Sequence, residues 1–200
     1  LDSQLVYASE SYAEQLETLE IQNEAALLEL NLILEKNATL TTDFSDFNAG
    51  AQAVVLQEDG KIIVAGGIAG QLGVSRYNTD GSLDLSFSED GVTTIGFASD
   101  VYASAVALQR DGKIVVGGYG YGNFVLARLH PNGSLDTSFG GDGRVVTNFY
   151  DHNDGLSALA IQPDGKIIAA GYAFNNTDYS TSDFALARYN PDGILDLSFA

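Results

Sequence analysis

The sequence predicts an all-β fold, an arc of about three four-stranded sheets, preceded by an N-terminal α-helix. Two recurring motifs carry this prediction. Asp-Gly-Lys occurs at residues 59–61, 111–113 and 164–166, and Leu-Asp-x-Ser-Phe occurs at 83–87, 135–139 and 195–199. Each copy also reads as four short strands separated by turn residues. Repeat offsets of 52 to 60 residues indicate a stacked or radial repeat architecture.

The middle copy shows the expected elements most clearly. Its four strands are predicted at 105–109, 113–118, 124–129 and 144–149, with a tight turn at Asp111 and Gly112. Large and small apolar residues alternate along the first strand, as in a sheet that is covered on both faces. The fourth strand alternates polar and apolar residues, which suits an outer edge. Four-stranded sheets repeated in this way are the blades of a β-propeller.

Three blades are expected, at residues 51–97, 103–149 and 156–200 of a repeat region that spans 39–200. The third copy stops before its fourth strand. Residues 39–44 align with the fourth strands of the other copies, so we expect them to supply an outer strand. Because propellers typically use ~4–8 blades, the chain is an arc of a larger propeller, which we favour, or arcs associate to complete one. The expected partners are then the remaining blades of the same propeller or a second copy.

Residues 1–38 are expected to form an acidic amphipathic helix or linker. Ser11 and Glu14 have the spacing of a capping box, and apolar residues follow at intervals of three or four up to about residue 36. Such a helix would pack on the repeat region or on another domain. Alternatively it would pair in a coiled coil, in which Asn23 at a core position could set the register.

Composition excludes several classes of function. Lys and Arg number 9 against 27 Asp and Glu, a net charge of −18, which argues against nucleic acid and anionic membrane surfaces as partners. No apolar run is long enough to span a bilayer. Without Cys there is no disulfide, thiolate metal site or Cys nucleophile. Since the first residue is Leu1, we expect a processed or truncated piece that has lost any targeting sequence.

The middle copy also carries a family resemblance. DGKIVVGGY at 111–119 and FVLARLHPNGSLDTSFGGDGRVV at 124–146 resemble the delta-60 repeat family, an uncharacterised bacterial β-propeller repeat that occurs in tandem arrays. The first copy departs from the pattern at residues 73–75 and 88–89. The resemblance implies an extracellular or cell-surface bacterial protein with repeats beside other domains, and it implies no catalytic residues.

Residues that recur in every copy are expected to serve the architecture. An arginine on each predicted third strand recurs with an aspartate eight residues later: Arg76, Arg128 and Arg188 with Asp84, Asp136 and Asp196. A buried arginine needs a partner, and a carboxylate can accept two parallel hydrogen bonds from it. We therefore expect structural Arg–Asp bridges, within or between blades.

Calcium is the only cofactor that the sequence suggests. Asn78, Asp80, Gly81 and Asp84 resemble part of a calcium loop, as do their counterparts in the third copy, although turn chemistry accounts for them better. Asp151, His152 and Asp154 form a second cluster of metal-ligand residue types. A single His in an acidic loop is also compatible with no site at all.

Loops that differ between copies are the candidate ligand-binding surface, because a ligand site is asymmetric and carried by loops. The connections before the first strands and between the second and third strands are expected to open on one face. The longest is 172–183, and six of the ten tyrosines, Tyr102 among them, lie on this face. The candidate ligand-binding residues are Tyr119, Tyr121, Tyr150, Tyr172, Asn175, Asn176, Asp178 and Tyr179. Alternatively, the tyrosines cap the sheet layers.

These patterns favour a non-enzymatic binding or scaffold propeller that contacts a protein or a carbohydrate through the variable loop face. Two alternatives stay open. One is a hydrolase or lyase that uses carboxylates such as Asp151, Asp154 and Asp178, with calcium as a further option. The other is a set of purely structural spacer repeats. The sequence shows no phosphate-binding, dinucleotide-binding or zinc-protease signature.

Overall fold

The computed structural model of the protein describes residue 24 and residues 39–44, 48–150, 153–174 and 181–199. By its internal contacts the chain divides into two units, Leu1–Asp43 and Phe44–Ala200. The predicted N-terminal helix lies outside the described residues except for Glu24. Among the residues that are described, no helix is long and apolar enough to cross a membrane.

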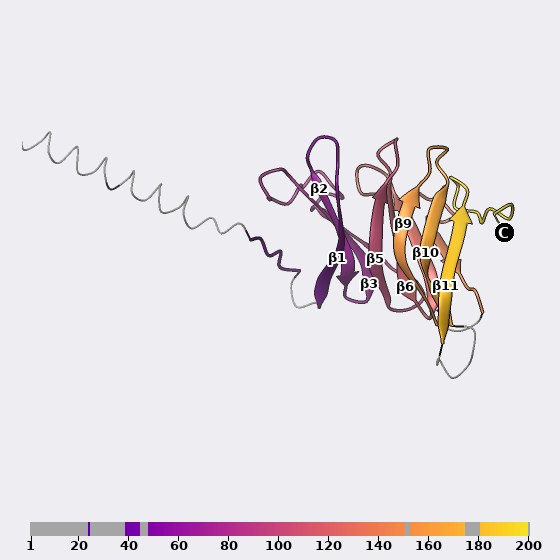
Figure 1. Ribbon diagram of the computed structural model, residues 1–200. Coiled ribbons are helices and arrows are strands. Elements are labelled where there is room, and N and C mark those ends of the chain that lie inside the picture. Colours follow the sequence, from indigo (N-terminus) through magenta and orange to yellow (C-terminus); the bar gives the residue numbers. More distant parts are fainter. Residues whose placement is uncertain (1–23, 25–38, 45–47, 151–152, 175–180, 200) are drawn as a thin grey trace, which may run out of the picture. The chain divides into compact units, whose positions relative to one another are not determined.

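Three antiparallel sheets follow one another along the second unit (Figure 1). Their strand orders are β1-β2-β3-β4, β5-β6-β7-β8 and β11-β10-β9. The predicted all-β fold of repeated sheets is therefore confirmed. The strands are β1 (Ala49–Leu56), β2 (Ile62–Ile68), β3 (Gln71–Tyr77), β4 (Val92–Ile95), β5 (Val101–Leu108), β6 (Ile114–Gly120), β7 (Asn123–Leu129), β8 (Arg144–Thr147), β9 (Asp154–Ile161), β10 (Ile167–Phe174) and β11 (Ser182–Tyr189).

Tight turns at Asp-Gly set the first hairpin of each sheet. Gly60, Gly112 and Gly165 have φ values of 83°, 81° and 85°, which side chains other than glycine disfavour. The turn before β6 is closed by a hydrogen bond from the Gln109 amide to the Lys113 carbonyl, at 2.9 Å. The turns lie where the sequence predicts them, but β5 begins four residues before the predicted strand at 105.

A bulge at one end of each sheet explains a second set of glycines. The pairing register shifts between Ala103 and Ala105 in the second sheet, and the other two sheets shift at the matching place. A Cβ atom on Gly118 would lie 1.9 Å from the carbonyl oxygen of Tyr102. Gly66 and Gly171 have the same relation to their partner strands. Only glycine permits this approach, and the bulge directs the start of each first strand towards the loop end.

Apolar side chains fill the spaces between neighbouring sheets. One buried cluster contains Ile63, Leu72 and Ile114 and joins the first sheet to the second. The other contains Phe124, Leu126 and Ile167 and joins the second sheet to the third. The second sheet is therefore buried on both faces, as the alternation of its first strand predicts.

The third sheet has three strands among the described residues, and β11 is its edge. Residues 39–44, predicted as an outer strand, are described but belong to no strand. The physical reason lies in the order of the sheets. The first and third sheets flank the second (Figure 1), so β1, which follows this segment in the sequence, and β11 belong to sheets at opposite ends of the row. Pairing with β11 inside one such chain would require the row to close on itself.

Candidate functional site

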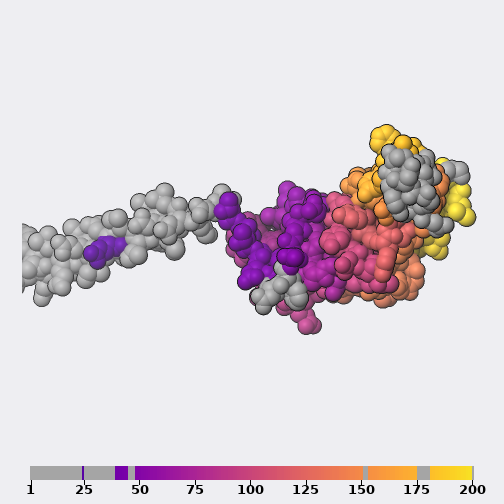
Figure 2. Space-filling view, turned by 90° about the horizontal axis from the view of Figure 1, so that it is seen from below, coloured from indigo at the N-terminus to yellow at the C-terminus, as the bar shows by residue number. Residues whose placement is uncertain are grey.

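Two kinds of loop meet at one end of the sheets, as the sequence predicts. The hairpin turns between second and third strands, at Gly70 and Gly122, accept hydrogen bonds from the first strand of the next sheet. The Val101 amide donates to the Gly70 carbonyl at 2.9 Å, and the Asp154 amide donates to the Gly122 carbonyl at 2.7 Å. These bonds fix each hairpin against the neighbouring sheet. Figure 2 looks onto this loop end.

A tyrosine pair occupies the second sheet at this end. Tyr102 on β5 and Tyr119 on β6 are direct cross-strand partners, and their ring centroids are 5.7 Å apart with the planes inclined by 31°. The Tyr102 ring lies over Gly67 of the first sheet, where a Cβ atom would come within 3.1 Å of it. The matching pair in the first sheet is Gly50 and Gly67. Of these two glycines it is Gly67 that leaves room for the Tyr102 ring, since a Cβ atom on Gly50 would meet nothing within 4 Å.

A third tyrosine reaches the same region from the third sheet. Tyr172 on β10 pairs with Gly155 on β9, and its ring covers that glycine so closely that a Cβ atom would lie 2.5 Å from it. The Phe174 ring contacts the Tyr172 ring edge-on, with centroids 5.8 Å apart. A glycine beneath the ring therefore sets the position of Tyr172 as it does for Tyr102.

These side chains line a groove of about 340 Å³, here called the tyrosine groove. An adjoining hollow of about 560 Å³ shares Asp100, Tyr102 and Tyr119 with it. Its four tyrosines, Tyr102, Tyr119, Tyr121 and Tyr172, are 39% to 75% exposed, so part of each ring is open to a ligand. The groove is lined by Asp100, Tyr102, Tyr119, Gly120, Tyr121, Gly122, Asn153, Asp154, Tyr172 and Phe174.

Tyr121 stands in an unfavourable backbone conformation. It occupies the hairpin turn between β6 and β7 with a φ of 52°, and its side chain is 75% exposed. Glycine, asparagine or aspartate fill such a position at lower conformational free energy than tyrosine does. Residues held in sparsely populated backbone regions concentrate at functional sites. Tyr121 is therefore a functional candidate on grounds of conformation as well as chemistry.

The structure brings together only some of the predicted ligand-binding residues. Tyr119, Tyr121 and Tyr172 line the tyrosine groove, and Tyr150 is exposed but does not line it. Asn175, Asn176, Asp178 and Tyr179 lie outside the described residues. Position 172 was predicted to begin a loop. It lies instead inside β10, because the pairing with β11 continues to Phe174 opposite Ser182.

The predicted Asp151, His152 and Asp154 cluster is described only at Asp154. This residue was predicted in an exposed acidic loop, which is wrong. It begins β9, is 2% exposed, and its Oδ2 atom accepts a hydrogen bond from the Phe149 amide at 2.8 Å. The carboxylate closes the connection between β8 and β9. Among the described residues no group of three or more His, Cys, Asp or Glu could hold a metal ion.

Sequence reasoning missed Asp100, Asn153 and the strand position of Phe174. Asp100 immediately precedes β5 and lies in both the groove and the adjoining hollow. The sequence does hold a signal for the tyrosine groove, because the residue types at equivalent positions differ between the copies. Where the second copy has Tyr102 and Tyr119, the first has two glycines and the third has Gly155 and Tyr172.

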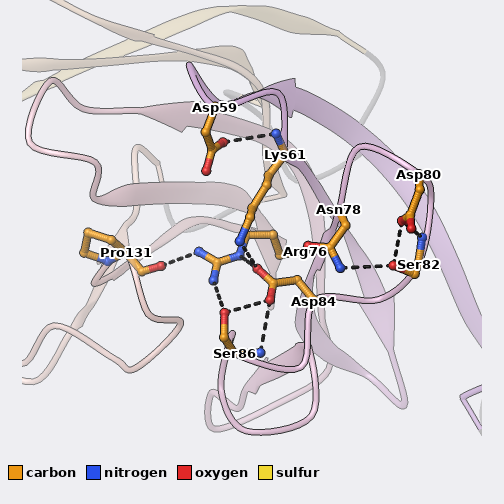
Figure 3. Close-up of polar contacts among 9 residues, drawn as sticks. All are labelled: Asp59, Lys61, Arg76, Asn78, Asp80, Ser82, Asp84, Ser86 and Pro131. Atoms are coloured by element: carbon orange, nitrogen blue, oxygen red, sulfur yellow. Dashed lines mark hydrogen bonds and ion pairs between the residues drawn. The ribbon is translucent and has the colours of Figure 1, made fainter.

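Each recurring arginine lies beside its recurring aspartate, and Figure 3 shows the pair of Arg76 and Asp84. Arg76 Nε lies 2.6 Å from Asp84 Oδ2, and the matching distance is 2.8 Å in the second and third copies. The pairing is not the two-bond arrangement that was expected, because the other carboxylate oxygen of Asp84 accepts the hydroxyl of Ser86 at 2.7 Å. The Arg76 guanidinium also lies over the Phe87 ring, 4.8 Å from its centroid.

The lysine of each Asp-Gly-Lys motif joins this cluster. Lys61 Nζ lies 2.8 Å from Asp84 Oδ2, and Lys166 Nζ lies 2.8 Å from Asp196 Oδ2. In the second copy Lys113 is more distant, 3.6 Å from Asp136 Oδ2. The motif thus does more than form a turn. Its lysine supplies a second positive charge to the aspartate.

These contacts keep the three aspartates ionised. The hydrogen bond from Lys61, followed by that from Ser86, holds the pKa of Asp84 well below its usual range. Lys166 lowers the pKa of Asp196 in the same way. Burial raises the pKa of Asp136, but the hydrogen bonds from Ser138 and the charge of Arg128 outweigh it and bring the pKa down to about 2.

The calcium-like segments are turns in the structure. Gly81 has a φ of 86°, and the Asp80 Oδ1 atom accepts hydrogen bonds from the amide and hydroxyl of Ser82 at 2.9 and 2.6 Å. Asp84, which a calcium loop would use as a ligand, is bound by Arg76 and Lys61 instead. Turn chemistry therefore accounts for this segment.

Comparison with solved structures finds partial similarity to other proteins. A candidate gluconolactonase is 14% identical with a TM-score of 0.46, and the match covers 78% of this chain and 49% of that one. An exo-1,5-alpha-L-arabinanase from a bovine ruminal metagenomic library is 12% identical with a TM-score of 0.46, and the match covers 78% and 59%. The chain spans about half the length of these proteins.

No curated protein sequence matches the chain. A family model does match, a domain of unknown function described as the DUF5122 beta-propeller. It matches residues 57–87, 109–139 and 162–199, which together make up half of the chain. Each match runs from just before an Asp-Gly-Lys turn to the Ser-Phe end of the second motif. The chain therefore belongs to the DUF5122 β-propeller family.

Proposed function

We propose that the chain is a non-enzymatic binding module that takes a carbohydrate in the tyrosine groove. One observation carries this proposal: Tyr102, Tyr119, Tyr121 and Tyr172, which come from two sheets, line one groove together with Asp100 and Asn153. Partly exposed aromatic faces stack on the apolar faces of sugar rings, and carboxylate and amide groups pair with sugar hydroxyls. At about 340 Å³ the groove falls within the ~300–1,000 Å³ of ordinary ligand pockets.

The conformation of Tyr121 supports a binding role over simple capping of the sheet. A tyrosine that only covered the sheet end would gain most from burial, yet this side chain is 75% exposed. It also occupies a backbone position that asparagine or glycine would fill with less strain. An exposed aromatic ring kept at such a position is explained by a ligand that contacts it.

The hydrolase or lyase alternative receives less support. Of its three carboxylates, Asp151 and Asp178 lie outside the described residues, and Asp154 is buried and accepts the Phe149 amide. Asp154 lines the groove, so a catalytic use of it predicts that Asp154→Asn abolishes turnover of a bound glycan. A protein ligand at the same face, and a purely structural role, are the remaining alternatives.

We further propose an extracellular or cell-surface location in a bacterium. This proposal rests on the resemblance of residues 111–119 and 124–146 to the delta-60 repeat alone. An outward location fits a module that binds glycans, and the acidic composition favours solubility in that setting.

A glycan array followed by calorimetry tests the function. The chain is expected to bind a subset of glycans, and Tyr172→Ala and Tyr121→Ala should each weaken that binding at least tenfold. The matched control is Tyr150→Ala, which removes an exposed tyrosine that does not line the groove. The proposal is wrong if no glycan binds, or if the two groove variants bind as tightly as the control. Binding that survives a chelator would count against calcium as a cofactor.

A further inference from the structure

We infer that the third sheet of one chain binds the first sheet of a second copy, head to tail, through the same contacts that join the sheets within the chain. The two internal junctions show what such a contact requires. The first and third sheets stand at the two ends of the row (Figure 1), and each presents one half of such a contact. This inference concerns the ends of the row and does not depend on the tyrosine groove.

Each internal junction uses an arginine that reaches into the next repeat. Arg76 Nη1 donates to the carbonyl oxygen of Pro131 at 2.7 Å, and Arg128 Nη1 donates to that of Pro191. A backbone bond accompanies each contact, from the Ser88 amide to the Asn132 carbonyl at 2.8 Å in the first junction. The second junction has the matching bond from Gly140 to Asp192 at 2.7 Å.

A phenylalanine completes each junction beneath the same turn. Phe87 and Phe139 are both 0% exposed, and they lie under Gly133 and Gly193 of the following repeat. A Cβ atom on these glycines would come within 3.0 and 2.8 Å of the rings, so glycine is required for the contact. In the third repeat the equivalent Phe199 is 38% exposed. The ring that two repeats bury is open in the third.

The outer face of the third sheet is apolar and uncovered in the same way. Phe184 and Leu186 on β11 are 97% and 50% exposed. The residues at the same register positions of β7, Phe124 and Leu126, are 0% exposed because the third sheet covers them. The third sheet therefore presents the surface that the second sheet uses for binding its neighbour.

The first sheet presents the complementary half. Val54 and Leu56 on β1 are 64% and 67% exposed, whereas the equivalent Val106 and Leu108 on β5 pack against the buried core. The turn at residues 78–81 matches the turns that receive the internal arginines. Its Asn78 amide bonds to the Ser82 carbonyl at 2.8 Å, as His130 does to Ser134, and Gly81 has a φ of 86° against 89° at Gly133.

The contacts of the internal junctions predict which residues of two copies would meet. Arg188 would donate to the carbonyl of Thr79 in the second copy, and Phe199 would lie beneath its Gly81. Residues 39–44 of that copy, which align with fourth strands, would then lead into β1 next to the open edge at β11. An added strand is the usual way in which such an edge is satisfied.

Sedimentation velocity on the whole chain and two end variants tests the inference. Phe184→Asp blocks the third sheet, and Val54→Asp blocks the first. Both side chains are exposed in the single chain, so both variants should stay folded. We expect the wild-type chain to sediment as more than a 21.1 kDa monomer and each variant to sediment as a monomer. Because each copy carries a net charge of −18, salt near ~0.15 M should be present to screen the repulsion.

Mixing the two variants gives the decisive result. One variant keeps a free third sheet and the other a free first sheet, so the equimolar mixture should form a two-copy complex, weaker than the wild-type assembly. Val146→Asp, on an exposed residue of the second sheet, is the matched control and should assemble as wild type does. A monomeric wild-type chain at all concentrations, a single end variant that still assembles, or a mixture that stays monomeric would each overturn the inference.

Discussion

Arg76 donates a hydrogen bond from Nη1 to the carbonyl oxygen of Pro131, 2.7 Å away in the following repeat. The same guanidinium pairs through Nε with Asp84 of its own repeat and reaches Ser86 Oγ through Nη2, at 3.2 Å. One side chain therefore joins two sheets and is only 8% exposed. With its donors used inside the protein, it is placed to hold the repeats together rather than to bind a ligand.

Removing the carboxylate of one such cluster should be strongly destabilising. Asp136→Ala leaves Arg128, 5% exposed, without its charge partner, and breaking a buried pair in this way costs about 3–5 kcal/mol. The free energy of unfolding in urea measures the effect. Asp142→Ala is the control, since Asp142 contacts Arg144 at 3.7 Å on the surface and such pairs contribute about 0–1 kcal/mol. Equal losses in the two variants would contradict the structural role.

Acid should weaken the fold through the same carboxylates. The pKa of Asp136 falls from 3.8 to about 2 on folding, so the folded protein binds fewer protons than the unfolded chain between these values. The stabilisation is therefore complete above pH 3.8 and is lost as the pH falls towards 2. Asp84 and Asp196, whose pKa values are also lowered, add to the loss. Urea midpoints measured from neutral pH downwards should fall less steeply for Asp136→Asn than for the wild type.

Replacing Tyr121 should separate stability from binding. Tyr121→Asn relieves the strain of a φ of 52° and should raise the free energy of unfolding by about 1 kcal/mol, while glycan binding weakens. Ala69→Asn, in the equivalent turn with a φ of 51°, should stabilise the fold to a similar degree. Thermal melts and calorimetry report the two effects. A Tyr121→Asn variant that is no more stable than the wild type would refute the strain argument.

The bulge glycines should tolerate no side chain. A Cβ atom on Gly118 would stand 1.9 Å from the Tyr102 carbonyl oxygen, so Gly118→Ala should displace β5 and destabilise the sheet by more than about 3 kcal/mol. Gly50→Ala meets nothing within 4 Å and should change stability by less than about 0.5 kcal/mol. Circular dichroism melts compare the two. Since Tyr102 belongs to the displaced strand, Gly118→Ala should weaken ligand binding as well.

Leu40 offers a further check on the association of two copies. If residues 39–44 of one copy extend the sheet at β11 of another, Leu40→Asp should weaken association without unfolding the chain, because Leu40 is 61% exposed. Sedimentation at several concentrations measures the change. Unaltered association would exclude residues 39–44 from the contact between copies. The contact between the third and first sheets would still be tested by Phe184→Asp and Val54→Asp.

Local sequence patterns predicted the sheets and their turns because those features depend on neighbours in the chain. Asp111 and Gly112 specify a hairpin, and the recurrence of Arg128 with Asp136 indicates a pair. The carbonyl of Pro191 that completes the Arg128 contact is backbone. No residue type marks it, so its role appears only when the repeats are placed side by side.

The tyrosine groove was predictable as a face but not as a set of residues. Tyr119 and Tyr172 stand out by composition, whereas their placement depends on Gly67 and Gly155 leaving space on neighbouring strands. Asp154 looks like part of an exposed acidic loop in sequence, but its carboxylate is drawn inside by the Phe149 amide. Residues 39–44, which align with fourth strands, belong to no strand of the structure, and their role as an outer strand stays a prediction.

An arginine side chain that bonds to two repeats at once also limits how the number of repeats in such a gene can change. Because Arg76 and Arg128 each bond within their own repeat and to the next, a duplication or deletion of one full period, 52 or 60 residues here, returns each of these arginines to an equivalent carbonyl wherever the recombination breakpoint falls. A partial event leaves a buried positive charge without its acceptor. Selection against that state would confine copy-number change to whole periods, so lineages could vary the length of the array while the junction chemistry stays constant.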